Sequence, residues 1–377
     1  MAVFGTRPEA IKMAPVVHAL RKTTEIDVVV TVTAQHRSML DQVLELFEII
    51  PEFDLGIIED RQTLTSITTK ALTGLEPILR GYRPDMVVVQ GDTTSTFAGA
   101  LASFYQRIPV AHVEAGLRTG NPNLPYPEEI NRRLTSRLAA LHFSPTAEAR
   151  DNLLAEGVSR EHIVVTGNTV IDALLDALRR RTGCESPVLT ELDSHSRPVL
   201  LVTTHRRESW GEPMRQIGLA LADIARAEPE VIILFPVHRN PVVREVILPC
   251  LQGLRNVQVI EPLDYGDFVR LMARSTLVLT DSGGIQEEAP SLGKPVLVLR
   301  ATTERPEAVR AGTVRLVGTD RTAVRDAALN LLRDPSAYEA MAKRANPYGD
   351  GHAARRIATA ICRYFGTGDH PPDEFRA

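Results

Sequence analysis

Three carboxylates stand where the chain is expected to leave a strand or to enter a helix. Asp92 follows an apolar, strand-like run, Glu114 closes the next run, and Glu128 opens a helical segment. Carboxylates that lie close together in a cleft push their pKa values apart, so that one donates a proton while another accepts one. Capping by Asp92 and stabilisation of a helix start by Glu128 are the structural alternatives. If the three groups meet, they suit a reaction that moves a proton on carbon.

A second group of residues is suited to binding phosphate. Arg7 and Lys12 follow the first apolar run, in a loop that begins at Gly5 and enters a helix near Pro8. Backbone N–H groups at a helix start attract anions, and the two cations would strengthen that attraction. The loop matches neither the dinucleotide fingerprint nor the nucleotide P-loop, which counts against a dehydrogenase or a kinase. An ordinary turn with two solvated cations is the alternative.

The second half of the chain repeats the anion-binding pattern. His205 and Arg206 end one strand-like run, and His238 ends the next. The glycine pair at 283–284 would let a pyrophosphate approach the backbone at a helix start. Glu288, one turn further into that helix, could accept hydrogen bonds from a ribose diol. These features predict a nucleotide site in this half, with a plain glycine turn as the alternative.

Strand-like runs alternate with helical patterns along almost the whole chain. The runs are continuously apolar, as in strands buried on both faces, so the order predicts parallel sheets covered by helices. The expected strands are 1–4, 26–33, 86–90, 110–114, 141–144 and 162–166, then 198–205, 231–237, 257–261, 276–280 and 295–299. The expected helices are 9–23, 37–47, 64–82, 94–106, 128–138 and 169–178, then 213–227, 241–250, 265–274, 284–292 and 321–332.

Length and composition restrict the class of protein. The chain has 377 residues, above the roughly 250–300 at which one core usually splits into two domains. The polar stretch 180–197 is the expected linker between two doubly wound domains. A net charge of −4 counts against a nucleic-acid binder. Three dispersed cysteines suggest a reducing cytoplasm. No apolar run approaches the roughly 18 residues that a membrane span needs.

Motifs spread over the whole chain carry a family likeness. They are 4–15 (FGTRPEAIKMAP), 33–47 (TAQHRSMLDQVLELF), 91–94, 112–120 (HVEAGLRTG), 127–131 (PEEIN), 166–173 (TGNTVIDA), 205–209 (HRRES), 279–299, 302–308 (TTERPEA) and 346–351 (NPYGDG). Together they resemble the bacterial non-hydrolysing UDP-N-acetylglucosamine 2-epimerases. The block 281–295 is the most specific part of this likeness.

The resemblance implies a fold and an activity. The fold would be GT-B-like α/β, with two Rossmann-like doubly wound parallel-sheet domains at 1–168 and 169–349, the active site in the cleft between them, and a C-terminal helix within 350–377 packing back on the first domain. The activity would be the reversible conversion of UDP-N-acetylglucosamine to UDP-N-acetylmannosamine. In this isomerase reaction UDP is eliminated anti across C1–C2 to give 2-acetamidoglucal and is then added again.

The resemblance also implies the setting of the reaction. Neither NAD nor a metal would be needed, and no nucleic acid or membrane would be a partner. The enzyme would be a cytoplasmic homodimer that supplies N-acetylmannosamine for cell-surface polysaccharide synthesis. UDP-N-acetylglucosamine would be both substrate and allosteric activator.

Position by position, the resemblance assigns roles to individual residues. Asp92, Glu114 and Glu128 would transfer protons, and which of them is acid and which is base stays open. His205 and Lys12 complete the expected catalytic set, beside the departing diphosphate. The expected substrate and UDP contacts are Arg7, Lys12, His205, Phe268, Ser282, Gly283, Gly284, Glu288 and Arg305. The expected allosteric contacts are Gln35, His36, Arg206 and His238. Leu263 departs from the pattern, because some relatives have a glutamine near the uracil.

Three other functions compete with this one. A GT-B glycosyltransferase would share the UDP site but need not bring three carboxylates from the first domain to the substrate. A hydrolysing epimerase is often fused to a kinase, for which 377 residues leave no room. A sugar-nucleotide sensor would bind the ligand without exchanging a proton.

Overall fold

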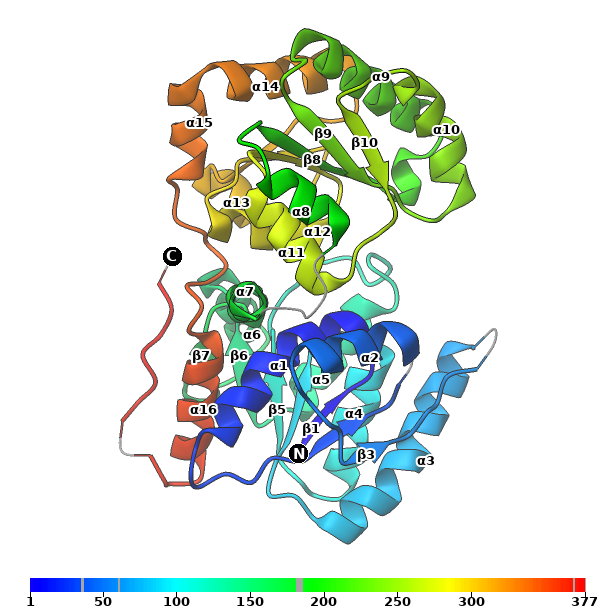
Figure 1. Ribbon diagram of the computed structural model, residues 1–377. Coiled ribbons are helices and arrows are strands. Elements are labelled where there is room, and N and C mark those ends of the chain that lie inside the picture. Colours follow the sequence, from blue (N-terminus) through cyan, green and yellow to red (C-terminus); the bar gives the residue numbers. More distant parts are fainter. Residues whose placement is uncertain (35–36, 60–61, 181–185, 369, 377) are drawn as a thin grey trace. The chain divides into compact units, whose positions relative to one another are not determined.

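The computed structural model divides into two compact α/β units. The first comprises Met1–Asp176 and Tyr348–Ala377, and the second comprises Ala177–Pro347. Each unit has its own parallel sheet with helices packed on it (Figure 1). The predicted class, two doubly wound parallel sheets, is confirmed. The structure describes residues 1–34, 37–59, 62–180, 186–368 and 370–376.

The sheet of the first unit has the strand order β3-β2-β1-β4-β5-β6-β7. Its strands are β1 (Ala2–Phe4), β2 (Val30–Val32), β3 (Phe53–Asp54), β4 (Val87–Gln90), β5 (Val110–Val113), β6 (Leu141–Ser144) and β7 (Ile163–Val165). The helices of this unit are α1 (Arg7–Arg21), α2 (Arg37–Leu46), α3 (Leu64–Tyr82), α4 (Thr94–Tyr105), α5 (Glu128–Leu138), α6 (Ala147–Ala155), α7 (Thr169–Arg179, which crosses into the second unit) and α16 (Ala353–Tyr364), with the 3₁₀ turn η1 (Arg160–His162).

Threonine N-caps start several of these helices. The hydroxyl groups of Thr6, Thr63, Thr93 and Thr146 each accept a backbone N–H from three residues further on. Such a cap satisfies one of the N–H groups that a helix start leaves without an internal partner. The caps therefore fix where the strands give way to α1, α3, α4 and α6.

The sheet of the second unit has the order β10-β9-β8-β11-β12-β13. Its strands are β8 (Val199–Thr203), β9 (Ile232–Pro236), β10 (Val257–Ile260), β11 (Leu277–Thr280), β12 (Val296–Val298) and β13 (Val314–Leu316). Its helices are α8 (Pro187–Asp193), α9 (Glu212–Ala227), α10 (Pro241–Leu251), α11 (Tyr265–Arg274), α12 (Gly283–Glu288), α13 (Pro306–Ala311), α14 (Arg321–Arg333) and α15 (Pro335–Ala342), with the 3₁₀ turns η2 (Arg207–Ser209) and η3 (Ala289–Leu292).

The direction in which strands are added reverses once in each sheet. In the first sheet the reversal lies between β1 and β4, and in the second it lies between β8 and β11. At such a switch point the loops leave their strands in opposite directions and open a crevice at the carboxyl ends, where ligands of open α/β sheets bind. The fold therefore directs attention to the loops that follow these four strands.

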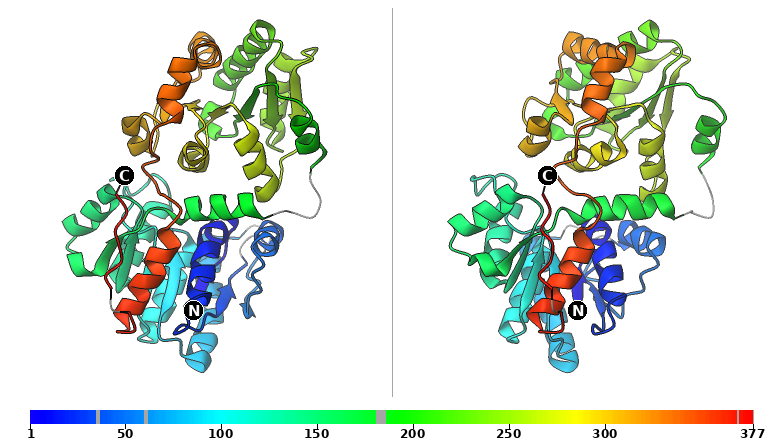
Figure 2. Two further views of the ribbon diagram at one scale, coloured as in Figure 1. Left: turned by 60° about the vertical axis from the view of Figure 1, so that its left-hand side comes forward. Right: turned by 90° about the vertical axis from the view of Figure 1, so that its left-hand side faces the viewer.

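Helix α7 belongs mainly with the first unit. Its Asp172 carboxylate accepts hydrogen bonds from the backbone N–H groups of Ala353 and Ala354, at 3.2 and 2.9 Å, and so holds the start of α16. Helix α16 in turn packs on α1, as the red and blue helices in Figure 2 show. The boundary consequently falls inside α7, whereas the sequence placed it before this helix, at 168.

Most of the predicted elements are confirmed, with ends that differ by a few residues. The sequence missed β3, β13, α6, α8, α13 and α15, most of which are short elements. The prediction that 180–197 is an irregular linker is wrong in part, because α8 lies inside it. Pro187 suits the first position of that helix, since its missing N–H would have no partner there in any case.

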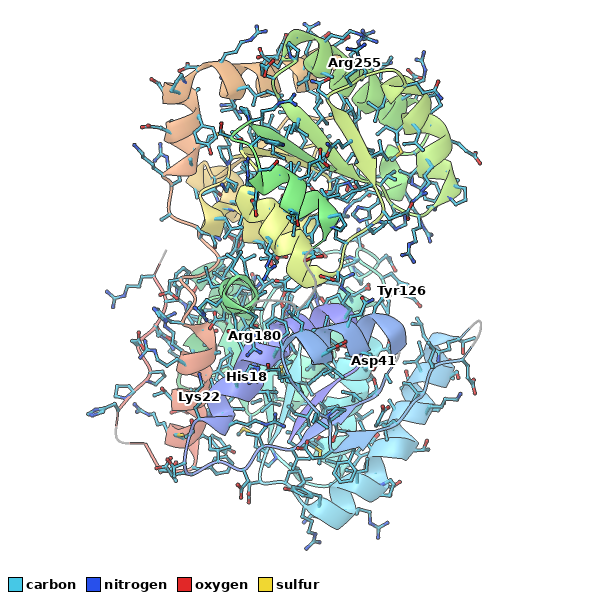
Figure 3. All side chains as sticks on the ribbon, in the orientation of Figure 1. His18, Lys22, Asp41, Tyr126, Arg180 and Arg255 are labelled. Carbon is cyan, nitrogen blue, oxygen red and sulfur yellow. The ribbon has the colours of Figure 1, made fainter. Side chains whose placement is uncertain are left out.

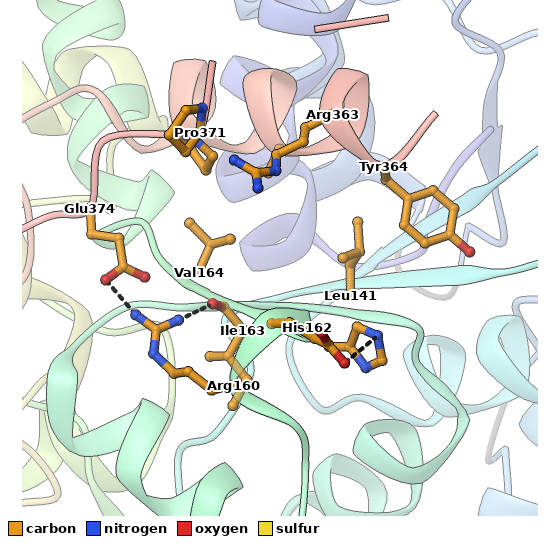
Figure 4. A pocket seen from close by; sticks show the side chains of 12 residues that line it. Leu141, Arg160, His162, Ile163, Val164, Arg363, Tyr364, Pro371 and Glu374 are labelled. Carbon is orange, nitrogen blue, oxygen red and sulfur yellow. Dashed lines mark hydrogen bonds and ion pairs between the residues drawn. The ribbon is translucent and has the colours of Figure 1, made fainter. Parts of the chain in front are cut away.

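The C-terminal segment covers β7, the edge strand of the first sheet. Phe375 N–H donates to the Val165 carbonyl at 2.8 Å, and the Glu374 carboxylate accepts the Val165 N–H at 3.1 Å and pairs with Arg160 at 2.7 Å. A cavity of about 500 Å³ lies beside this edge (Figure 4), and its lining includes none of the predicted site residues. An edge strand covered in this way is protected from pairing with another chain.

No helix in the described part of the chain is both long enough and apolar enough to span a bilayer.

We expect Gly5→Ala to destabilise the first unit. A methyl group on Gly5 would overlap the Thr33 hydroxyl and lie 2.9 Å from Ser95 Oγ. Overpacking of this kind typically costs about 1–3 kcal/mol of the free energy of unfolding, measurable by urea denaturation. The matched control is Gly81→Ala, since Gly81 lies in α3 with open space around it and should gain roughly 0.5–1 kcal/mol. Equal stability of the two variants would contradict the packing of the Gly5 loop.

Candidate functional site

Glu114 has an unusual backbone conformation, and two side-chain donors hold its carboxylate. Glu114 directly follows β5 and has a φ of +64°. Lys12 Nζ donates to both of its carboxylate oxygens, at 2.7 and 2.5 Å, and Gln90 Nε2 donates to Oε2. A left-handed backbone costs a residue with a side chain roughly 1–3 kcal/mol and persists where the surroundings hold it, often at active sites. The structure thus brings the predicted residues Lys12 and Glu114 together.

Asp92, at the switch point of the first sheet, is also held from several sides. Its carboxylate forms an ion pair with Arg132, and its carbonyl oxygen accepts a hydrogen bond from Asn131 Nδ2 at 3.0 Å. Burial raises the pKa of Asp92, the Arg132 guanidinium opposes this rise, and the negative charge of Glu114 adds to it. Asp92 and Glu114 therefore influence each other's protonation, which is the arrangement expected for a paired acid and base.

A further buried carboxylate, Glu9, ties the two loops of this switch point together. Its Oε2 accepts the backbone N–H groups of Gly5 and Thr6, at 2.9 and 2.7 Å, and its Oε1 accepts the hydroxyl groups of Thr93 and Thr96, at 2.6 and 2.7 Å. The residue is 2% exposed. Sequence reasoning assigned Glu9 no role, although the Thr-x-x-Glu spacing of a capping box was visible at positions 6–9.

Two other predicted residues of the first unit have polar groups for which the described part of the chain supplies no partner. Glu128 is the first residue of α5, and its Oε2 is buried with no hydrogen-bond partner among the described residues. Arg7 lies in the first turn of α1, half-buried, and forms no ion pair with any residue that the structure describes. A buried carboxylate oxygen without a partner is costly, so a ligand group at this point would be stabilising.

In the second unit, Asp281 organises the loop that carries His205. Its Oδ2 accepts the Thr204 hydroxyl and the backbone N–H groups of His205 and Arg206, at 2.9, 2.8 and 2.9 Å. Its Oδ1 lies 3.0 Å from His205 Nδ1. Asp281 follows β11 and His205 follows β8, so this contact spans the switch point of the second sheet.

The environment of Asp281 favours its charged form. Burial raises its pKa, but the side chain of His205 and the backbone N–H groups of His205 and Arg206 lower it more, and the result is a lowered pKa. His238 stacks on His205 with ring centres 5.7 Å apart, and the imidazole of His205 is 41% exposed. The negatively charged Asp281 carboxylate therefore holds the His205 ring in place, and part of that ring stays exposed.

Two guanidinium groups face the backbone at the start of α12. A methyl group built on Gly283 would lie 3.7 Å from Arg206 Nη2 and 4.0 Å from Arg305 Nη2. Arg305 forms an ion pair with the buried Glu287, and Arg206 lies 3.4 Å from Glu304. Two cations beside a half-buried glycine backbone suit the binding of a phosphate group.

The remaining predicted residues of this unit lie around the same turn or on α11. Glu288 is buried, and its Oε2 accepts a hydrogen bond from Tyr265 at 3.1 Å. Ser282 and Gly284 flank Gly283 and are half-buried, as are Phe268 on α11 and Leu263 before it. Arg206 and His238, predicted as allosteric contacts, lie beside His205, whereas Gln35 and His36 lie outside the described residues.

Behind these residues, Arg300 joins two loops. It pairs with Glu304 at 2.7 Å and with Glu208 at 2.8 Å. Burial raises the pKa of Glu304, but hydrogen bonds from Arg300 outweigh it and bring the value to about 2. The Arg300 side chain therefore holds Glu304 charged beside Arg206.

The first unit thus carries two carboxylates and a lysine at its switch point, and the second carries a histidine and two arginines beside a glycine turn. Comparisons with known proteins identify the family. The family model described as UDP-N-acetylglucosamine 2-epimerase matches residues 18–362. The chain belongs to this family.

Relatives and solved structures support this assignment over nearly the full length. The Escherichia coli K12 UDP-N-acetylglucosamine 2-epimerase is 55% identical over 370 residues, covering 96% of this chain and 97% of the relative. The Bacillus subtilis one is 53% identical over 375 residues, covering 100% and 98%. The crystal structure of the Neisseria meningitidis UDP-GlcNAc 2-epimerase bound to UDP-GlcNAc has a TM-score of 0.86 at 49% identity, covering 96% of this chain and 99% of that one. The predicted family, the GT-B-like fold class and the assignment as an isomerase are confirmed.

We expect Asp281→Asn to lower the stability of the second unit near neutral pH and to weaken its dependence on acid. The carboxylate has a folded pKa below its ordinary value of 3.8, so its contribution is present above that pH and is lost as the pH falls through the folded value. Losing the charge should cost about 1–3 kcal/mol of the free energy of unfolding near neutral pH.

Urea denaturation above and below about pH 3.8 measures this effect. The wild type should lose more stability on acidification than the variant does. Asp193→Asn, at an exposed position of the same unit, is the matched control. If both variants keep the wild-type dependence on acid, the role of Asp281 in the His205 loop is wrong.

Proposed function

We propose that this protein catalyses the reversible epimerisation of UDP-N-acetylglucosamine at C2, giving UDP-N-acetylmannosamine. The observation that carries the proposal is the pair of carboxylates Glu114 and Asp92 at the carboxyl ends of neighbouring strands of the first sheet, with Lys12 of α1 bound to Glu114. A reaction that inverts a carbon bearing hydrogen needs an acid and a base, and these carboxylates supply both. The family relationship identifies the sugar nucleotide.

The chemistry we propose is an elimination followed by an addition. The C2–H bond and the bond from C1 to the diphosphate oxygen break on opposite faces, the C1–C2 double bond of 2-acetamidoglucal forms, and UDP leaves with the electron pair. A carboxylate takes the C2 proton. UDP then returns to C1 while an acid delivers a proton to the other face of C2, so atoms and charge balance over the cycle.

The carboxylates fit the proton transfers for an electrostatic reason. Asp92 has a raised pKa, which suits a group that must gain and lose a proton near neutral pH. Glu114 faces the Lys12 ammonium, which favours its charged form. The buried Oε2 of Glu128 has no hydrogen-bond partner among the described residues, so it could accept one from the substrate. Which carboxylate acts as acid and which as base follows from substrate orientation.

The second unit would bind the UDP part. Negative charge builds up on the diphosphate as C1–O breaks, and fixed cations lower the barrier by stabilising that charge. Arg305 beside Gly283 is suited to this, and His205 is held by a buried carboxylate in a way that suits a hydrogen bond to phosphate. Arg7 would add a cation from the first unit. Phe268, Ser282, Gly284 and Glu288 are the proposed contacts to the nucleoside.

We also propose the wider setting that the family likeness implied. The product would supply N-acetylmannosamine for cell-surface polysaccharides, and the free thiols Cys250 and Cys362 fit a reducing cytoplasm. A second UDP-N-acetylglucosamine would act as an allosteric activator through Arg206 and His238, with Gln35 and His36 as further contacts. The stacking of His238 on His205 offers a route from that site to the diphosphate.

A homodimer is the assembly we propose, and helix α5 supports it. Ile130 and Leu134, one turn apart on this helix, are 39% and 43% exposed, and Tyr126 just before it is exposed as well (Figure 3). Apolar side chains grouped on one surface typically mark a contact between proteins. A second copy of the chain would cover this group.

The function is tested by incubation with UDP-N-acetylglucosamine in D2O, followed by NMR. We expect UDP-N-acetylmannosamine to appear with deuterium at C2, and the substrate pool to gain deuterium as the reaction reverses. Transfer of sugar to an added acceptor would instead indicate a glycosyltransferase, and free N-acetylmannosamine a hydrolysing enzyme. Binding without any label would indicate a sensor.

We expect Asp92→Asn, Glu114→Gln and Glu128→Gln each to lower kcat by ~100-fold or more, because proton transfer by a positioned side chain contributes about this much. Initial rates of epimerisation by coupled assay or NMR measure the effect. Glu161→Gln, at an exposed position of the same unit, is the control and should keep the wild-type rate. Wild-type rates in all three site variants would show that the carboxylates were assigned wrongly.

A further inference from the structure

Helix α5 has its polar face turned toward the interior of the first unit. Glu129, Asn131, Thr135 and Ser136 are buried, whereas Ile130 and Leu134 are exposed. A surface helix normally buries its apolar stripe instead. The inner face of α5 must therefore be satisfied by specific hydrogen bonds and ion pairs, and these bonds lead to the loop that carries Asp92.

Arg132 is the charged member of this inner face. Its Nη2 donates to Asp92 Oδ2, and its Nη1 lies 3.5 Å from the fully buried Glu129. The Arg132 side chain is 11% exposed and that of Asp92 is 27% exposed. A guanidinium held between two carboxylates has a fixed plane, so it fixes the orientation of the Asp92 carboxylate as well.

The backbone of the same loop is held by two neutral donors. Asn131 Nδ2 donates to the Asp92 carbonyl at 3.0 Å. His112 on β5 is fully buried, and its Nε2 lies 2.7 Å from the Gly91 carbonyl, which can only accept. Burial lowers the pKa of His112 to about 4, so the ring is neutral and carries its proton on Nε2. The loop therefore cannot turn freely, and the orientation of its carboxylate depends on Arg132.

We propose that Arg132 is a positioning residue of the epimerisation: through its ion pair with Asp92 it orients that carboxylate toward the reacting carbon and sets its protonation. The proposal rests on the proposed function, since it needs Asp92 to exchange a proton with the substrate. Arg132 itself contacts no reacting atom in this account.

Three charged groups face Asp92 and determine the direction of the effect. They are Arg132 on α5, Glu114 after β5 and Lys12 on α1. Arg132 lowers the pKa of Asp92 and is the largest of these three contributions. Without it, burial and the Glu114 charge raise that pKa further. The limb of the pH–rate profile that reports Asp92 should then move to higher pH, whether Asp92 acts as base or as acid.

The test compares Arg132→Gln and Arg132→Lys with the wild type. We expect Arg132→Gln to lower kcat by about 10- to 100-fold, since a misplaced catalytic group costs about this much, with a smaller change in KM and a limb shifted to higher pH. Arg132→Lys keeps the charge but not the planar fork, so its limb should stay near the wild-type position while kcat falls. Arg80→Gln, at an exposed position of α3 and away from the exposed face of α5, is the matched control and should match the wild type.

A double-mutant cycle separates positioning from a structural role. If Arg132 acts through Asp92, Asp92→Asn with Arg132→Gln should be no slower than Asp92→Asn alone. Additive losses in kcat, or an unshifted limb in folded Arg132→Gln, would overturn the proposal. Circular dichroism and urea denaturation establish that each variant is folded. Deuterium incorporation by the wild type tests the proposed function by itself. If the wild type incorporates no deuterium, the proposed function fails, which is a different outcome from failure of the Arg132 proposal.

Discussion

A buried carboxylate joins two loops at the switch point of each sheet, and the rest of the chemistry depends on these two connections. Glu9 binds the loop after β1 and the loop after β4 in the first unit. Asp281, itself in the loop after β11, binds the loop after β8 in the second. Both accept backbone N–H groups. Asp281 binds the proposed site residues His205 and Arg206 directly, whereas Glu9 binds Thr93, the neighbour of Asp92. In both units a buried carboxylate links two loops, although the residues that form the link differ.

The parallel sheets explain why these connections are needed. Loops at a switch point leave in opposite directions, which opens a crevice but also removes the mutual support of neighbouring turns. A buried carboxylate that accepts several hydrogen bonds restores that support at the carboxyl ends of the strands. The cost of burying the carboxylate is offset by its donors, of which Glu9 has four and Asp281 has three besides the imidazole.

Each of the two proposed acids of the first unit is paired with a cation. Asp92 and Glu114 are close enough to influence each other, and each has its own cation, Arg132 or Lys12. Such pairing keeps two carboxylates close at a tolerable electrostatic cost while leaving their protonation adjustable. The left-handed backbone at Glu114 shows that the fold accepts strain to obtain this arrangement.

Much of the fold could be predicted, because continuous apolar runs mark doubly buried strands and the residues after them mark the ligand edge. Asp92, Glu114 and His205 were predicted as site residues in this way. The strands β3 and β13 were missed because they are partly exposed edge strands without a continuous apolar run. The buried polar face of α5 was missed because sequence patterns are interpreted on the assumption that a helix buries its apolar side chains, and α5 buries polar ones instead. Glu9 was visible only as a cap, since its threonine partners are more than eighty residues away along the chain.

The most direct test of the central claim is positional isotope exchange in UDP-N-acetylglucosamine labelled with oxygen-18 between C1 and the β-phosphorus. If UDP leaves C1 and returns, the label should spread to the non-bridging oxygens of the β-phosphate, in wild type but far more slowly in Asp92→Asn. If epimerisation occurs while all of the label stays in the oxygen between C1 and the β-phosphorus, the elimination is contradicted. The roles proposed for the residues at both switch points would then be wrong as well.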